Sequence, residues 1–160
     1  REGDIVGRGV GMPRPADTGP DVPLPEGQVV VRVIPGPQDE WLTEHARAAL
    51  FEEPFAVSVH GDRAGLRLDG PALAHRVRDE FLSDGLLPGA IQVPSGGRPI
   101  VILPDGPTTG GYPKAAAVIS ADLRLVAQSR PGTRLRFAAV SMEDAIDALR
   151  GQRMEVRDAG

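Results

Sequence analysis

The sequence of 160 residues contains no cysteine. Disulfide bonds, zinc–thiolate sites and cysteine nucleophiles are therefore excluded, and the composition fits a cytoplasmic protein, because disulfides are rare in that compartment. No run of apolar residues is long enough to span a bilayer as a helix. The net charge is −4, so the chain lacks the excess of basic residues that binds nucleic acids or anionic membranes. We expect neither as a partner.

Aromatic residues are scarce, at 4% of the chain, whereas glycine (20) and proline (16) are abundant. Hydrophobic residues make up 41%, which is enough for one domain with a packed core. Many short strands joined by Gly/Pro turns produce this composition. The sequence therefore predicts a mostly β fold of about eight strands with two or three short helices. Because an open sheet of that size would leave exposed edges, we expect it to close into a barrel.

The chain divides into an N-terminal segment and one domain. Residues 11–27 carry many prolines and glycines and almost no apolar periodicity, which is typical of a linker. Residues 1–5 resemble the last strand or turn of a preceding unit, and the chain starts with Arg rather than Met. We expect residues 1–27 to be a linker and the end of a missing upstream domain, and residues 28–160 to be the barrel domain.

Apolar and β-branched runs between turn residues predict the elements of this domain. Expected helices begin at the capping residues Thr43, Ser120 and Ser141 and end near residues 50, 128 and 149, with Gly151 after the last. The segment 73–81 fits either a strand or a helix. Expected strands cover residues 29–34, 55–59, 64–68, 90–93, 99–103, 115–119 and 134–140.

The segment Thr108–Pro113 (Thr-Thr-Gly-Gly-Tyr-Pro) combines two hydroxyls, two flexible glycines and a phenol. Backbone N–H groups at Gly110 and Gly111 can form a concave anion site. The hydroxyls of Thr108, Thr109 and Tyr112 can bind a carboxylate or a urea-like group. The competing interpretation is a strained turn that ends at a proline.

Several polar residues elsewhere are candidate ligands. Arg63 and Arg67 are four residues apart, so a regular strand would place both guanidinium groups on one face, where they could bind carboxylates. The alternatives are a solvated barrel face and structural pairing with Asp62 and Asp69. Gln92 stands in an otherwise apolar strand and is either a substrate ligand or a hydrogen-bonding core residue. Lys114 could neutralise an anionic intermediate or could simply be exposed.

The three histidines, His45, His60 and His75, do not have the spacing of metal ligands, so we expect no metal site. His45 is expected on the solvated face of a helix. His60 follows a predicted strand near the candidate site and could act as an acid or base, although a structural role is the more common outcome.

Four segments, in order, resemble the family of biotin-dependent carboxyltransferase-like proteins that includes allophanate hydrolase subunit 2 and the 5-oxoprolinase C subunit. The resemblance covers roughly residues 28–137 and corresponds to the C-terminal half of such proteins. The segments are Arg32-Val-Ile-Pro-Gly-Pro-Gln-Asp39; Arg63-x-Gly-x-Arg-Leu68; Gly89-Ala-Ile-Gln-Val-Pro94; and Asp105 with Thr108-Thr-Gly-Gly-Tyr-Pro-Lys114.

This resemblance implies a closed cyclophilin-like β-barrel and a role as a subunit of a complex that acts on a small amide, urea-like or lactam substrate. It implies catalytic roles for Thr108, Thr109 and Tyr112. Substrate binding would fall to Arg63, Arg67, Gln92, Gly110, Gly111 and Lys114. The expected partner resembles allophanate hydrolase subunit 1 or the 5-oxoprolinase B subunit. No cofactor is expected on this chain; ATP or biotin would be used by the assembled complex.

The chain departs from the family pattern at two places. Pro107 stands where most members have glutamine, and Gly61-Asp-Arg-Ala-Gly65 stands where members often have Ser-Asn-Arg-Met-Gly. Loss of polar groups beside a candidate site supports a second hypothesis, in which the domain is a non-catalytic interaction or regulatory module that binds a cyclophilin-like partner subunit.

Overall fold

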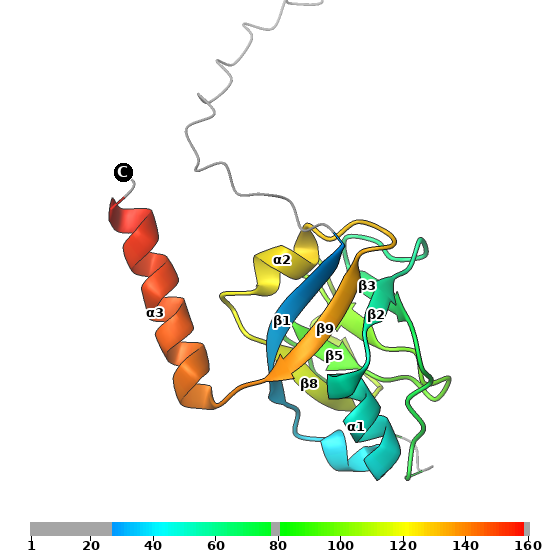
Figure 1. Cartoon of the computed structure of the whole chain (residues 1–160). Coiled ribbons are helices and arrows are strands. Elements are labelled where there is room, and N and C mark those ends of the chain that lie inside the picture. The colour runs from blue at the N-terminus through cyan, green and yellow to red at the C-terminus, as the bar shows by residue number, and fades with distance from the viewer. Residues whose placement is uncertain (1–26, 78–80, 159–160) are drawn as a thin grey trace, which may run out of the picture.

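The computed structural model describes residues 27–77 and 81–158, and within them seven strands close into a barrel. The predicted linker and upstream end over residues 1–26 lie outside the described residues. The barrel strands follow the order β1-β8-β5-β6-β3-β2-β9, and β9 closes on β1. Strands β4 and β7 form a separate two-stranded sheet. The expected closed, mostly β barrel with short helices is therefore confirmed (Figure 1).

The nine strands of the described residues are short, and most match the predicted runs. Their bounds are β1 Gln28–Pro35, β2 Phe55–Val57, β3 Gly65–Asp69, β4 Asp84–Gly85, β5 Ala90–Gln92, β6 Ile100–Ile102, β7 Thr109–Gly110, β8 Lys114–Val118 and β9 Arg134–Ala139. The two-residue strands β4 and β7 are not signalled by alternation, because so short a segment has no measurable period.

Alternating burial along the strands explains the barrel core. In β3, Leu66 and Leu68 are buried while Arg67 between them is exposed, as the period of two in a strand requires. Strand β9 alternates in the same way, and its Phe137 packs against Phe55 of β2 with ring centroids 6.1 Å apart. One face of β3 and one face of β9 therefore fill the interior.

Barrel closure depends on a parallel pair between the two ends of the domain. Strand β1 runs parallel to β9, in register from Gln28 opposite Arg134 to Val33 opposite Ala139. Figure 1 shows the two strands side by side. Parallel neighbours need a long connection, and here the remaining barrel strands supply it.

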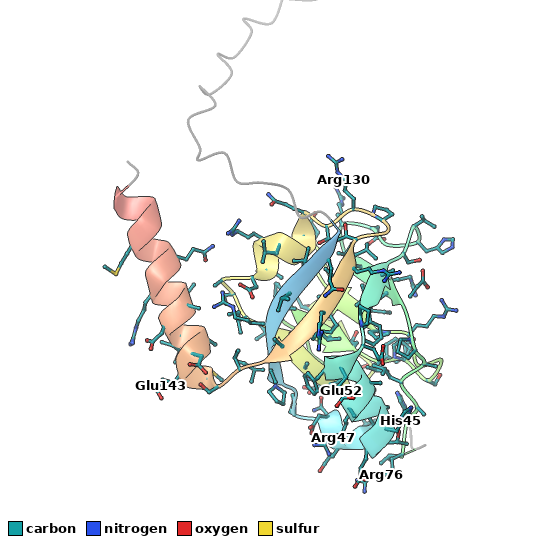
Figure 2. The ribbon with its side chains drawn as sticks, in the orientation of Figure 1. His45, Arg47, Glu52, Arg76, Arg130 and Glu143 are labelled. Carbon is teal, nitrogen blue, oxygen red and sulfur yellow. The ribbon has the colours of Figure 1, made fainter. Side chains whose placement is uncertain are left out.

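Three α-helices and one short 3₁₀ segment, η1 (Asp39–Trp41), accompany the barrel in the described residues. Helix α1 (Glu44–Glu52) begins as predicted, with the Thr43 hydroxyl accepting a hydrogen bond from the Ala46 N–H at 3.2 Å. Its residues His45, Arg47 and Glu52, labelled in Figure 2, are exposed. The expected solvated position of His45 is therefore confirmed.

Two helix boundaries differ from the prediction. Helix α2 (Leu123–Ala127) has Asp122, not Ser120, at its N-cap position. Helix α3 (Met142–Asp158) does not end at Leu149 but continues through Gly151. Gly151 is not among the glycines with a positive φ, so it is not the left-handed stop that the prediction assumed. Figure 1 shows α3 projecting away from the barrel.

The ambiguous segment 73–81 forms neither a helix nor a strand over its described residues. It is held beside η1 instead: His75 forms an isolated antiparallel bridge with Leu42, and the Arg76 N–H donates to the Trp41 carbonyl at 2.7 Å. This pairing brings His75 close to the end of the barrel that carries Trp41.

Candidate functional site

The Thr-Thr-Gly-Gly-Tyr-Pro segment lies between β6 and β8. Backbone hydrogen bonds to β4 hold one side of it in place. Within it, β7 pairs antiparallel with β4, with Thr109 opposite Gly85 and Gly110 opposite Asp84. The Leu86 N–H also donates to the Thr108 carbonyl at 2.9 Å. The segment is therefore a fixed element of the fold rather than a loose connection.

Gln92 of β5 fixes the other side of the segment. Gln92 is only 4% exposed, and its Nε2 donates to the Tyr112 carbonyl at 3.1 Å. A Cβ at Gly110 would lie 2.7 Å from this Nε2, so any larger residue there would have to displace the Gln92 amide. Gln92 is thus a hydrogen-bonding core residue, and it also lines a cleft described below.

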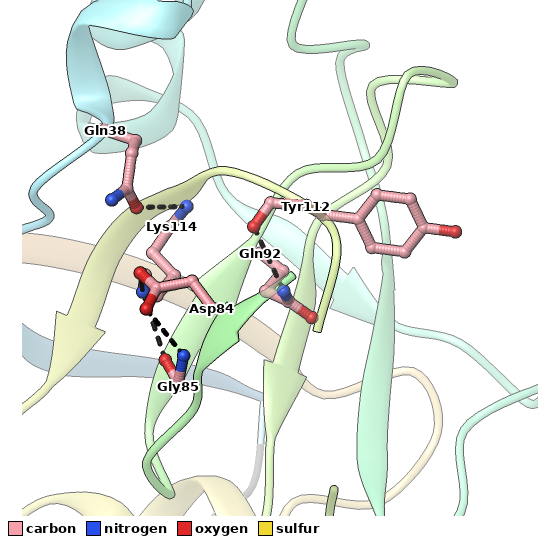
Figure 3. A network of polar contacts seen from close by, with 6 residues as sticks. All are labelled: Gln38, Asp84, Gly85, Gln92, Tyr112 and Lys114. Atoms are coloured by element: carbon pink, nitrogen blue, oxygen red, sulfur yellow. Dashed lines mark hydrogen bonds and ion pairs between the residues drawn. The ribbon is translucent and has the colours of Figure 1, made fainter. Parts of the chain in front are cut away.

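Lys114, at the start of β8, joins three elements (Figure 3). Its Nζ pairs with the Asp84 carboxylate and donates to the Gly85 carbonyl at 3.1 Å. Its backbone N–H donates to Gln38 Oε1 at 3.1 Å. The ammonium lowers the pKa of Asp84 below its usual value, and the Gly85 N–H contributes to this shift. Lys114 therefore has a structural partner, and its role as a ligand stays a prediction.

Arg63 and Arg67 do not share a strand face as predicted. Strand β3 begins at Gly65, so Arg63 lies in the preceding turn, where its side chain is 89% exposed and its Nε is 3.6 Å from the Asp105 carboxylate. The Asp62 carboxylate closes this turn by accepting from the Ala64 N–H at 2.8 Å. The even spacing therefore does not place the two arginines on one face, because Arg63 belongs to the turn and only Arg67 lies in the strand.

A small cleft of about 230 Å³ brings two of the predicted ligands together. Arg67 and Gln92 both line it, and so does His60, the candidate acid or base. Pro107, the residue that departs from the family pattern, forms part of its wall. We call this the smaller cleft; its other lining residues are Asp62, Ala64, Gly65, Ile100 and Ile102.

A second cleft of about 880 Å³ lies next to the remainder of the segment. We call this the larger cleft. Gly111, Tyr112 and Pro113 contribute one wall, and the ring of Tyr112 points away from Gln92 and Lys114, as Figure 3 shows. Its other lining residues are Trp41, Ala74, His75, Val77, Phe81, Leu82, Ser83 and Ser95. Thr108 and Thr109 are exposed and line neither cleft.

His75 is the lining residue that sequence reasoning did not select. Its Nε2 lies 2.9 Å from the Val93 carbonyl. Because a carbonyl only accepts, Nε2 carries the hydrogen and Nδ1 of the neutral ring is left as an acceptor. The sequence offers no sign of this position beyond the presence of a histidine. His75 is placed by its pairing with Leu42, and both residues are distant in sequence from the Thr-Thr-Gly-Gly-Tyr-Pro segment. Within the described residues, no group of three or more metal-ligand side chains occurs.

Among the described residues, none of the helices has both the length and the apolar character needed to cross a membrane.

Sequence comparison finds relatives that are enzyme subunits. The chain is 39% identical over 122 residues to the 5-oxoprolinase C subunit of Escherichia coli, a match that covers 76% of this chain and 39% of the relative. It is 36% identical over 116 residues to the 5-oxoprolinase C subunit of Haemophilus influenzae, covering 72% of this chain and 38% of the relative. The chain therefore spans about two fifths of the length of these relatives.

The crystal structure of Kluyveromyces lactis urea carboxylase contains a similar fold. It superposes with a TM-score of 0.78 at 25% identity, over 83% of this chain and 13% of that one. A model of the family described as carboxyltransferase domain, subdomains A and B, matches residues 4–139. This match spans most of the chain and includes the residues that line both clefts. The chain therefore belongs to the carboxyltransferase-domain family.

Proposed function

We propose that this chain contributes the substrate cleft of a multi-subunit enzyme of the 5-oxoprolinase type, acting on a small lactam or amide that carries a carboxylate. The observation that carries the proposal is that Arg67 and Gln92 line one small cleft. The two 5-oxoprolinase relatives support it, because both are named as subunits. On this proposal the partner resembles the 5-oxoprolinase B subunit, and ATP or biotin would act elsewhere in a cytoplasmic complex.

The chemistry of the smaller cleft favours such a substrate. Gln92 is held by the Tyr112 carbonyl, so its carboxamide offers a fixed partner to an amide or lactam group. The guanidinium of Arg67 presents the planar fork that binds carboxylates. 5-Oxoproline has both a lactam and a carboxylate, whereas urea has no carboxylate. We therefore expect 5-oxoproline to bind more tightly than urea, with allophanate between them.

Catalysis in this proposal involves the neighbouring Thr-Thr-Gly-Gly-Tyr-Pro segment. Thr108, Thr109 and Tyr112 would orient the reacting carbonyl, and the backbone of Gly110 and Gly111 would help to stabilise the developing oxyanion. Because the two threonines are exposed, other parts of the complex would have to cover them. We expect the isolated chain to bind substrate without turning it over.

A non-catalytic interaction module is the second candidate function. It is favoured by one observation: Pro107 and Ala64, which replace residues usual in the family, both line the smaller cleft. In this case the chain would associate tightly with a partner subunit, and substitution of cleft residues would change neither association nor any turnover.

Isothermal titration with 5-oxoproline, allophanate and urea tests the first proposal, on this chain and on the complex with its companion subunit. Losing one charge-assisted contact in Arg67→Ala should weaken 5-oxoproline binding by about 10- to 100-fold. Gln92→Ala should have a comparable effect, and Arg136→Ala is the matched control, an exposed arginine on β9. Absence of binding for all three compounds in a well-formed complex would refute the substrate proposal and leave the interaction module.

A further inference from the structure

The larger cleft lies apart from Arg67 and Gln92, which carry the proposed substrate site, and its walls are organised for binding. Trp41 and Phe81 pack edge to face, with ring centroids 5.3 Å apart and planes at 83°. Tyr112 adds a third aromatic ring that is 45% exposed. The whole chain has only six aromatic residues, counting Trp 1, Tyr 1 and Phe 4. Three of them therefore line one cleft, which is the arrangement that holds flat apolar ligands.

The polar groups of this cleft are few and uncharged over the described residues. His75 is tied to the Val93 carbonyl through Nε2, which orients the ring and leaves Nδ1 as its remaining polar atom. Ser83 and Ser95 contribute hydroxyls. The Ser83 Oγ lies 3.7 Å from the position of a Cβ at Gly111, so Ser83 stands directly beside the Thr-Thr-Gly-Gly-Tyr-Pro segment.

Backbone hydrogen bonds fix the walls before any ligand binds. The Thr43 N–H donates to the Ala74 carbonyl at 3.0 Å, and the Leu73 N–H donates to the Gly97 carbonyl at 2.9 Å. The Val93 N–H donates to the Pro113 carbonyl at 3.0 Å. These three bonds join the segments that carry Trp41, His75, Ser95 and Pro113, so this part of the walls needs little ordering when a ligand enters.

We propose that the larger cleft is a second ligand site, which binds a molecule with a flat aromatic ring and an N–H donor. The ring would pack against Tyr112 and Trp41, and the N–H would donate to Nδ1 of His75. The proposal does not depend on the ligand of the smaller cleft, because neither Arg67 nor Gln92 lines the larger one, although Tyr112 has a role in both proposals.

Trp41 makes this site directly observable, since it is the single tryptophan of the chain. The probe is benzamide, a planar neutral amide, and the readout is Trp41 emission during titration. Two analogues separate the two parts of recognition: N,N-dimethylbenzamide keeps the ring but has no N–H donor, and cyclohexanecarboxamide keeps the N–H donor but has no flat ring. We expect saturable binding of benzamide in the millimolar range, given its size, and binding at least about fivefold weaker for each analogue.

Variants assign the contacts. His75→Ala should remove the difference between benzamide and N,N-dimethylbenzamide, whereas His45→Ala, on the exposed face of α1, should preserve it. Because His75 also contacts the Val93 carbonyl, Tyr112→Ala provides a second variant at an exposed side chain, and it should remove the difference between benzamide and cyclohexanecarboxamide.

Three results would overturn the proposal: equal binding of the three probes to the native chain, no saturable change in emission, or persistence of both differences in the two variants. Titration with 5-oxoproline in parallel tests the smaller cleft separately, because His75→Ala should leave the affinity for 5-oxoproline unchanged.

Discussion

Gly110 packs closely against the side chains of Gln92 and Leu86. A Cβ there would lie 2.7 Å from both Gln92 Nε2 and Leu86 Cδ1. We expect Gly110→Ala to displace the Gln92 amide, to cost about 1–3 kcal/mol of unfolding free energy, and to weaken ligand binding in the smaller cleft. Urea denaturation and calorimetric titration measure the two effects.

The adjacent glycine is the matched control. A Cβ at Gly111 would meet its nearest atoms, Phe81 O and Ser83 Oγ, at 3.7 Å, which is ordinary contact. Gly111→Ala should therefore leave the unfolding free energy nearly unchanged. If both substitutions have equal effects, close packing against Gln92 is not the reason for the first glycine.

Asp122 is a buried carboxylate, 4% exposed, that connects α2 to β1. It accepts hydrogen bonds from Arg32 Nε at 2.9 Å, from Nη2 at 2.6 Å and from the Arg32 backbone N–H at 2.8 Å. The same contact raises the pKa of Arg32. Asp122→Ala should lower the unfolding free energy by about 2 kcal/mol, because three hydrogen bonds to a charged group are lost while Arg32 keeps access to water.

Thermal and urea denaturation measure this loss. Asp147→Ala is the comparison, since Asp147 pairs with Arg150 on the exposed surface of α3, where such pairs contribute less than about 1 kcal/mol. A loss in Asp122→Ala no larger than in Asp147→Ala would contradict a structural role for the buried carboxylate.

At the scale of elements, the ion pair between Asp84 and Lys114 connects the sheet of β4 and β7 to β8. Hydrogen bonds from Lys114 and from the Gly85 N–H hold the pKa of Asp84 below its usual value. A carboxylate with a lowered pKa stabilises the fold above its unfolded pKa of about 4, and this contribution is lost as the pH falls through the lowered folded value. Stabilisation by the pair is thus complete at neutral pH and absent in strong acid.

Asp84→Asn should therefore destabilise the chain at pH 7, and its difference from the native chain should shrink as the pH falls below about 4. Amide hydrogen exchange at Leu86, whose N–H bonds to Thr108, reports on β4 and β7 directly. Glu52→Gln, at an exposed residue of α1, is the control. A difference that grows toward low pH would have the wrong sign for this mechanism.

The helix N-termini show where a local sequence pattern is sufficient to predict a cap and where it is not. The capping box at Ser141 is confirmed: the Asp144 N–H donates to the Ser141 hydroxyl at 3.1 Å, and the Ser141 N–H donates to the Asp144 carboxylate at 3.2 Å. The predicted cap at Ser120 is wrong. Asp122 takes the N-cap position, but its carboxylate bonds to Arg32, 90 residues away, rather than to its own helix. The contact with Arg32, which is distant in sequence, therefore determines that the Asp122 carboxylate does not cap its own helix.

At the scale of the whole molecule, α3 contacts the barrel through its first turns. Ala145 is buried beside Ile119 and Ala121, whereas Met154 is 65% exposed. A chain that ends at Leu149 should keep the stability of the barrel, with a melting temperature within about 3 °C of the native value, since little apolar area is lost.

A chain that ends at Val140 provides the contrast, because it also loses Ala145 and uncovers Ile119 and Ala121. It should be less stable by about 1–2 kcal/mol, measured by urea denaturation at neutral pH. Equal loss in both truncated chains would mean that the distal part of α3 contributes to folding, contrary to its exposed position in Figure 1.

The candidate residues that sequence patterns identify are distributed over two clefts in the folded chain. Gln92 and Arg67 line the smaller cleft, and Tyr112 lines the larger. The spacing predicts Arg63 beside Arg67, but the turn closed by Asp62 moves it away from the strand. No pattern selects His75, because its approach to Val93 joins residues 18 positions apart across different elements.

Most of the strands and α1 follow from the amino-acid sequence alone, since alternating burial and the Thr43 cap depend on neighbouring residues, and the ordered motifs identified the family. The parallel closure of β1 on β9 became evident only in three dimensions. The same is true of the contacts of Gln92 with Tyr112, Lys114 with Asp84 and Arg32 with Asp122. These pairs form only after the chain closes on itself, because each depends on the register between strands that are distant in sequence. The chemistry of both clefts consequently rests on contacts that no local pattern specifies.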